Sequence, residues 1–155
     1  MAGIIDGRLA DLGIELPQAS APAANYVPYT VSGNNVYISG QVPVSDGELK
    51  FIGKLGNEFG VDEGYAAARL CGLNIIAQVK DACGGDLDRV VRCLKLGGFV
   101  NSVPEFGDQP KIINGASDLM VEVFQDKGKH ARFAVSAASL PFGVAVEVDA
   151  VFEIA

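Results

Sequence analysis

Hydrophobic and polar residues alternate most regularly near the end of the chain, over residues 144–154. β-Branched residues recur there at every second position, which is the pattern of a strand with a buried face. An apolar run precedes it over residues 132–139, and residues 140–143, which contain both Pro and Gly, separate the two. Because Pro and Gly favour a tight change of direction, we predict two strands joined as a hairpin.

Two longer stretches repeat their apolar residues every three to four positions, which is the helical period. They cover residues 61–83 and 110–125. Asp62 is placed to cap the first of these helices, and Gly84 follows it as a stop signal. A shorter stretch with the same period, over residues 3–13, predicts a leading helix.

Four further segments have the composition of strands. They cover residues 25–32, 35–41, 48–54 and 87–100, and Gly and Asn between the first two predict a hairpin turn. With the two C-terminal strands this makes six. The order of the elements predicts an α+β fold, in which a six-stranded mixed sheet carries two helices on one face and a short N-terminal helix is added.

Both sides of the last predicted strand are apolar, which leaves little of the sheet suited to water. Val144, Val146 and Val148 point one way, and Ala145 and Val151 point the other way. Helices on one face cannot cover both. Since large exposed apolar patches mark interfaces, we expect an oligomer.

Length and charge narrow the class of protein. The chain has 155 residues, which is the size of one domain, and the Pro/Ala-rich segment 16–24 is too short to separate two. We therefore predict a single domain over residues 1–155. The formal net charge of −7, without any basic run, argues against nucleic acid as a partner, because phosphate groups require clustered Lys and Arg.

The sequence also bears on the compartment. It has no stretch of about 20 apolar residues, and its N-terminus lacks the apolar core of a signal peptide. Three cysteines, Cys71, Cys83 and Cys93, are an odd number without metal-ligand spacing, which favours a reducing compartment. We interpret Cys71 and Cys83 as small core residues. We expect a soluble, cytoplasmic protein with no membrane partner.

Groups that commonly carry catalysis are scarce. His130 is the one histidine of the sequence, so a Ser-His-Asp triad and a His-rich metal site are nearly excluded. We interpret His130 as a loop residue rather than a base. No Walker loop or GxGxxG motif follows a predicted strand and opens a helix.

Two charged residues of the C-terminal strands do not follow from fold formation alone. Arg132 begins a strand without an acidic neighbour in sequence, and Glu147 lies in mid-strand, where carboxylates are depleted. In a simple hairpin Arg132 lies opposite about Val151, which leaves Glu147 roughly 13 Å away at about 3.4 Å per residue. That distance is too long for a salt bridge, so we expect a ligand, a water or a neighbouring subunit between the two.

Five groups of residues together carry a family pattern. They are Ile38-Ser39-Gly40-Gln41-Val42-Pro43, Ala68-Arg69 with Asn74, Ala131-Arg132, Leu140-Pro141 and Val146-Glu147-Val148-Asp149-Ala150. With these residues the chain resembles the RidA/YjgF family, also known as L-PSP endoribonucleases or translation inhibitors. The resemblance covers about residues 25–154, and residues 1–24 resemble the N-terminal extension of a longer branch of that family.

The resemblance implies a homotrimer with a ligand cleft at each subunit interface. Archetypes of the family hydrolyse enamine/imine intermediates, such as 2-aminoacrylate, to a 2-keto acid and ammonia. By resemblance, Arg132 binds the substrate carboxylate and Glu147 holds the attacking water, while Ser39 and Gly40 line the cleft. Neither a metal nor an organic cofactor is implied, and the partner is a small carboxylate metabolite.

Some family positions leave alternatives open. The family tyrosine falls on Tyr26 by spacing or on Tyr29 by its Pro-Tyr dipeptide, and we favour Tyr26. The family asparagine, a substrate-binding residue, falls on Asp118 or is displaced to Asn114. The family cysteine two residues after the arginine is Ala134 here.

Three functions therefore remain to be separated. The first is a deaminase of small 2-imino acids, and the second is a non-catalytic trimer that binds a small carboxylate metabolite. The third is an endoribonuclease, against which the acidic charge and the single histidine argue.

Overall fold

The main sheet is mixed and has five strands. The computed structural model describes residues 3–21 and 24–155, and the strand order is β1-β2-β7-β5-β6. In that order the strands are Tyr29–Ser32, Asn35–Gln41, Val146–Ile154, Val90–Asn101 and Ala131–Ala137. Neighbouring strands are antiparallel, except that β5 and β6 run parallel.

The α+β class is confirmed, but one of the six predicted strands, residues 48–54, does not join the main sheet. Of residues 48–54, only β4 (Glu48–Leu49) is a strand, and it pairs with β3 (Val44–Ser45) in a separate ribbon. Phe51 and Gly53 both have positive φ, at 53° and 149°, which breaks the extended conformation. Strand β1 begins four residues after the predicted start at residue 25.

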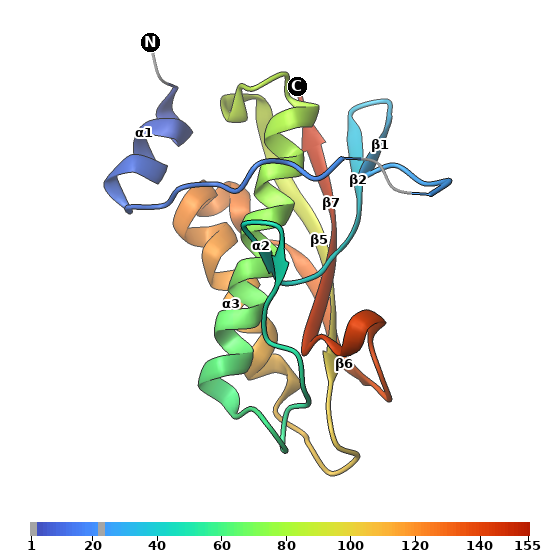
Figure 1. Cartoon of the computed structure of the whole chain (residues 1–155). Helices are drawn as coiled ribbons and strands as arrows, with labels where there is room; N and C mark the ends of the chain where they lie inside the picture. Colours follow the sequence, from blue (N-terminus) through green and yellow to red (C-terminus); the bar gives the residue numbers. More distant parts are fainter. Residues whose placement is uncertain (1–2, 22–23) are drawn as a thin grey trace.

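Two long helices cover one face of the sheet, as predicted. They are α2 (Val61–Ala82) and α3 (Gln109–Phe124), and Figure 1 shows them side by side on the same side of the strands. The cap of α2 is Gly60, while Asp62 lies within the first turn and its side chain caps nothing. There a carboxylate still interacts favourably with the positive end of the helix dipole.

The leading helix, α1 (Ile4–Asp11), packs against the same hydrophobic core. Its side chains Ile5 and Leu9 are buried, and the backbone N–H groups of Ile4 and Ile5 each donate to the Asp88 carboxylate over 2.9 Å. Residues 1–2 and 22–23 of the predicted N-terminal extension lie outside the described residues.

The predicted hairpin of the last two strands is wrong, because β5 lies between β6 and β7. Arg132 pairs with Leu96 on β5, and Leu96 pairs in turn with Ala150 on β7. The segment after β5 forms α3 and returns as β6 in the parallel direction, as crossover connections require. The Pro/Gly segment then carries the chain past the end of β5, with Phe142 and Gly143 at φ 60° and 73°.

The two faces of the sheet differ in what covers them. Leu96 and Ala150 are buried under the helices. Glu147 pairs with Phe99 and occupies the opposite face, which no helix of the described chain covers. Three large apolar side chains on the open face are exposed: Tyr37 (47%), Phe133 (36%) and Val135 (44%). None of the helices that the structure describes is long and apolar enough to cross a membrane.

The three cysteines lie in the core, as the sequence predicted for Cys71 and Cys83. Cys71, Cys83 and Cys93 are buried and unpaired in disulfides. Burial raises the pKa of each thiol, that of Cys93 to about 12. A thiol with a raised pKa is a weak nucleophile at neutral pH, so these residues fill space rather than react.

Candidate functional site

Arg132 lies near the start of β6 and points to the sheet face that the helices cover. Its Nη1 donates to the Ser117 hydroxyl (3.0 Å) and its Nη2 to the Pro110 carbonyl (3.3 Å). In the part of the chain that the structure describes, no carboxylate oxygen lies within 4.0 Å of this guanidinium. Arg132 is therefore held by neutral acceptors and remains available to an anion.

A shallow hollow of about 300 Å³ surrounds this guanidinium on the surface of α3. Its lining residues, which we call the Arg132 cluster, are Asn114, Ser117, Asp118, Val121, Lys129, His130 and Arg132. Both candidates for the family asparagine are present, since Asn114 and Asp118 are one helical turn apart on the same face of α3. The Asp118 carboxylate accepts a hydrogen bond from the Tyr65 hydroxyl (2.7 Å), and this bond raises the pKa of Tyr65.

Glu147 occupies the open face of the sheet, in the middle of β7. Its carboxylate lies over Gly40, where an added Cβ would be 2.7 Å from Oε2. Burial raises the pKa of Glu147 above its usual value, and the nearby Asp149 carboxylate raises it further. A half-buried carboxylate with a raised pKa is a reasonable general base.

The Ser39-Gly40 segment is a bulge in β2. The pairing with β7 shifts register between Ile38 and Gln41, so the two residues between them leave the ladder. The Ser39 hydroxyl donates to the Val27 carbonyl (2.7 Å), which fixes the bulge to the preceding segment. Bulges often redirect side chains beside active sites, and Gly40 allows the close approach of Glu147.

A narrow cavity of about 120 Å³ adjoins this bulge and is lined by Tyr26, Ser39 and Gly40, among other residues. We call Tyr26, Ser39, Gly40 and Glu147 the Glu147 cluster. The alternative tyrosine, Tyr29, instead donates its hydroxyl to Asp81 (2.7 Å), and this bond is the main reason that its pKa is raised to about 12. Tyr26 is 60% exposed and lines this cavity together with the bulge residues.

A single chain does not bring the two clusters together. Arg132 on β6 is aligned, across β5, with Ala150 on β7, and Ala150 is three residues along β7 from Glu147. At about 4.8 Å between strands and 3.4 Å per residue, the two Cα atoms are roughly 14 Å apart. The two side chains also point to opposite faces of the sheet. A direct salt bridge between Arg132 and Glu147 within one chain is therefore ruled out by distance and direction, as expected, although the hairpin on which that expectation was based is absent.

Three polar residues beside the Glu147 cluster had no role assigned from the sequence, although Gln41 and Asn74 belong to the family pattern. Gln41, Asn74 and Gln78 line the same cavity and are almost fully buried. The Asn74 amide donates to the carbonyls of Val42 (3.3 Å) and Val44 (3.0 Å) and so holds the segment that leaves the bulge. Asn74 and Gln78 are one turn apart on the buried face of α2, and that polar spacing was the available signal.

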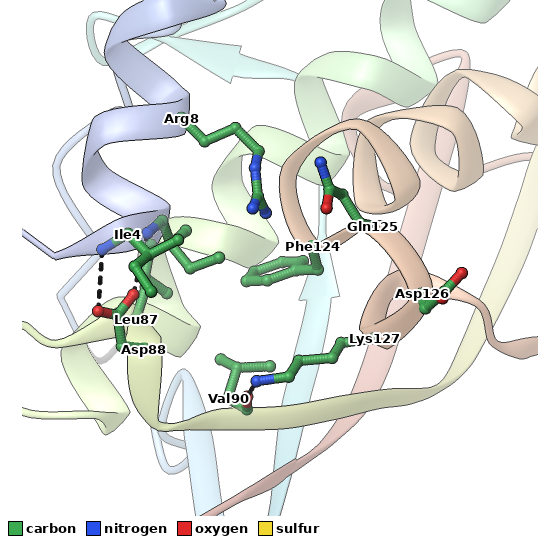
Figure 2. A pocket seen from close by; sticks show the side chains of 10 residues that line it. Ile4, Arg8, Leu87, Asp88, Val90, Phe124, Gln125, Asp126 and Lys127 are labelled. Carbon is green, nitrogen blue, oxygen red and sulfur yellow. Dashed lines mark hydrogen bonds between the residues drawn. The ribbon is translucent and has the colours of Figure 1, made fainter.

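Another hollow, also about 300 Å³, lies between α1 and the end of α3 (Figure 2). Its two cations already bond main-chain carbonyls: Arg8 donates to Val123 (2.6 Å) and Lys127 to Val90 (3.4 Å). The Asp88 carboxylate accepts hydrogen bonds from backbone N–H groups of α1, and these bonds lower its pKa. These groups attach α1 to the core, and the hollow contains none of the predicted site residues.

Metal ligands are not grouped in the described chain: within it, no three His, Cys, Asp or Glu side chains are placed to hold an ion. The candidate chemistry therefore consists of one unneutralised guanidinium, one half-buried carboxylate and a strand bulge with a phenol beside it. This set can bind a small carboxylate and activate a water.

Comparison with known proteins shows the family. Residues 6–153 match the family described as "YjgF/chorismate mutase-like, putative endoribonuclease", and the chain belongs to it. The chain is 51% identical to Protein TCP17 of Trypanosoma cruzi, over 99% of this chain and 96% of that protein.

Two solved structures are similar over nearly the whole chain. The protein Atu1372 from Agrobacterium tumefaciens, whose function is unknown, is 50% identical, with a TM-score of 0.91 over 98% of this chain and 94% of its own. A "putative endoribonuclease" from Shewanella oneidensis MR-1 is 38% identical, with a TM-score of 0.93 over 98% of this chain and 100% of its own. Both comparisons include the N-terminal helix α1.

Proposed function

We propose that this protein hydrolyses small 2-imino acids or their enamine tautomers to 2-keto acids and ammonia. The observation that carries the proposal is the state of Arg132, a positioned guanidinium that, within the described residues, is held only by the Ser117 hydroxyl and the Pro110 carbonyl. A planar, permanently charged group with free N–H donors suits a substrate carboxylate, which it binds through two parallel hydrogen bonds.

The proposed active unit is a homotrimer in which the Arg132 cluster of one protomer faces the Glu147 cluster of its neighbour. Two features support it: the clusters occupy opposite faces of one sheet, and the open face exposes apolar side chains. A symmetric trimer would cover that face and join the two half-sites at each interface.

In the proposed reaction, Arg132 fixes the substrate carboxylate so that the C2 imine carbon faces Glu147. The ionised Glu147 takes a proton from a water, whose oxygen forms a bond to C2 while the C=N π electrons move to nitrogen, and protonated Glu147 returns this proton to that nitrogen. Glu147 then takes the proton of the new hydroxyl and passes it to the amine, so that the C=O bond forms as the C–N bond breaks. Ammonia leaves and the 2-keto acid remains, so one water is consumed for each imine.

The alternative is a trimer that binds a small carboxylate without turnover. Its support is Asp118, whose carboxylate shares the hollow with Arg132 and would repel an anionic substrate there. A ribonuclease activity has less support, because the net charge is −7 and the sequence contains one histidine.

The test is release of pyruvate from freshly generated 2-aminoacrylate. The proposal predicts turnover by the wild type and its loss in Arg132→Ala, with the oligomeric state unchanged by sedimentation. A wild type that binds 2-keto acids but shows no turnover would support the binding trimer instead. RNA cleavage that persists through further purification, without pyruvate release, would favour the ribonuclease.

A further inference from the structure

A continuous chain of hydrogen bonds leads from Arg132 into the protein. Arg132 Nη1 lies 3.0 Å from the Ser117 hydroxyl, and that hydroxyl lies 2.8 Å from His130 Nε2. On the other side of the ring, His130 Nδ1 lies 2.6 Å from the Gly128 carbonyl. The Arg132 guanidinium is thereby connected to a backbone atom through two side chains.

The direction of each bond follows from what each group can donate. A carbonyl only accepts, so the Gly128 contact places the proton of a neutral imidazole on Nδ1 and leaves Nε2 as an acceptor. Ser117 then donates its hydroxyl proton to Nε2, and its oxygen lone pairs face Arg132. Burial lowers the pKa of His130 by more than the Gly128 hydrogen bond raises it, and the Arg132 charge lowers it further, which favours this neutral ring.

Ser117 is unusual for a serine inside a helix. Such a hydroxyl commonly bonds the carbonyl four residues earlier or points to water. In α3 it instead bonds two side chains that follow the helix, one before β6 and one within it. Helix propensity does not favour serine at this position, and the contact with Arg132 supplies a reason for it.

We propose that Ser117 and His130 are positioning residues that orient the Arg132 guanidinium for the ligand carboxylate. His130 Nε2 accepts a hydrogen bond from the Ser117 hydroxyl, so the Ser117 oxygen faces Arg132 and accepts from Nη1. The Pro110 carbonyl accepts from Nη2. The remaining guanidinium donors are left for the ligand. A flexible arginine loses conformational freedom when it binds, and a guanidinium oriented beforehand loses less.

The first test is calorimetric binding of 2-ketobutyrate, with kcat and KM measured where turnover is found; the choice of ligand rests on the proposed function. Ser117→Ala removes the oxygen that accepts from Arg132, and His130→Phe removes the nitrogen that accepts from Ser117. In both variants we expect Kd and KM to rise about tenfold with kcat nearly unchanged. His130→Gln supplies an amide acceptor that does not titrate, and Ser117→Thr keeps the hydroxyl, so both should restore most of the affinity. Glu122→Gln, on the same helix, is the control.

A second measurement does not depend on any ligand. In ¹⁵N NMR spectra, a guanidinium with both Nη groups bonded rotates slowly and gives separate Nη signals, which Arg132→Lys identifies by their loss. We expect these signals in the wild type and in Ser117→Thr, and their merging in Ser117→Ala and His130→Phe. Unchanged signals and unchanged affinity in Ser117→Ala would overturn the positioning role. A wild type that shows the signals but binds no 2-keto acid would contradict the proposed function alone.

Discussion

Gly40 is the residue at which backbone geometry and the proposed chemistry meet. It has no side chain, and the space where one would begin is occupied by the Glu147 carboxylate. That carboxylate is the end of a flexible side chain, so a methyl group there would move it rather than unfold the strand. The orientation of the Glu147 side chain thus depends on the absence of a side chain at position 40.

We predict that Gly40→Ala lowers kcat/KM about 10- to 100-fold, because the new methyl group displaces the proposed base from its water. The free energy of unfolding should change by less than about 1 kcal/mol in urea titrations. Gly107→Ala is the matched control, since nothing lies within 4 Å of its Cβ position. Full activity in Gly40→Ala would mean that Glu147 needs no fixed direction.

Glu147 should also produce a pH dependence. Its pKa is raised, chiefly by burial and further by Asp149, and only the ionised form can accept a proton from water. We predict that kcat/KM falls as the pH is lowered through this raised pKa, at a pH above the ordinary glutamate value of about 4.3. Glu147→Gln should lose about 10²- to 10⁴-fold in activity where Glu147 is ionised in the wild type, and this difference should shrink as the pH falls. A wild-type profile that is flat across this range would exclude Glu147 as the base.

The same shift has an effect on stability of known sign. The folded state binds this proton more tightly than the unfolded state, so the contribution of Glu147 to stability falls as the pH rises from its ordinary pKa through the raised one. Glu147→Gln should therefore be more stable than the wild type at pH 7, and the difference should shrink towards pH 4. Urea midpoints at the two pH values measure this, and a less stable Gln variant at pH 7 would contradict it.

At the residue scale, the sequence pointed to Arg132 and Glu147 because each violates a local preference. Arg132 has no acidic neighbour along the chain, and Glu147 is a carboxylate in mid-strand. Ser117 could not be found in this way. Its significance comes from His130 and Arg132, which the fold brings beside it from 13 and 15 residues away.

Helices α2 and α3 approach closely because small residues face each other. A Cβ on Gly115 of α3 would collide with the Tyr65 carbonyl and lie 3.0 Å from the Arg69 nitrogen, both backbone atoms of α2. Backbone atoms inside a helix cannot move aside independently. The helix pair must separate to admit even one methyl group there.

We predict that Gly115→Ala lowers the free energy of unfolding by about 1–3 kcal/mol, the usual cost of overpacking. The control is Gly7→Ala in α1, where nothing lies within 4 Å and the loss of backbone freedom in the unfolded chain should stabilise by about 0.5–1 kcal/mol. Urea unfolding followed by circular dichroism measures both. If Gly115→Ala were as stable as the wild type, the helices would be less tightly packed than described.

At the element scale, helices were easier to predict than strand order. The three helices follow from apolar spacing, and their ends were predicted to within about two residues. The C-terminal hairpin was wrong because adjacent strands with a short Pro/Gly connection favour pairing, whereas β6 pairs with β5 across α3. Local composition does not encode that choice, since it depends on the packing of α3 against the sheet.

At the scale of the whole molecule, no helix among the described residues covers the second face of the sheet. Phe133 packs edge-on against Phe99, with ring centroids 5.2 Å apart, and Phe133 and Val135 remain partly exposed on the sheet face that also carries Glu147. Apolar side chains around a half-buried carboxylate suit an interface better than water. The proposed trimer assigns this face to the contact between protomers.

We predict that Phe133→Glu converts the proposed trimer into monomers in sedimentation experiments, because it places a charge in the proposed apolar contact. Helical content should stay unchanged, and binding of 2-ketobutyrate should be lost with the interface. Ile4→Glu is the control, since that side chain is 72% exposed on α1 and should leave the trimer intact. A wild type that sediments as a monomer would refute the proposed assembly.

The central claim is that each site combines Arg132 from one protomer with Glu147 from the next. The most direct test mixes two inactive variants, Arg132→Ala and Glu147→Gln, and allows their subunits to exchange. In equal mixtures about three-quarters of the trimers are mixed, and each has one intact site of three, so about a quarter of wild-type activity should return. Mixed trimers that form, as shown by mass spectrometry, yet stay inactive would contradict the shared site.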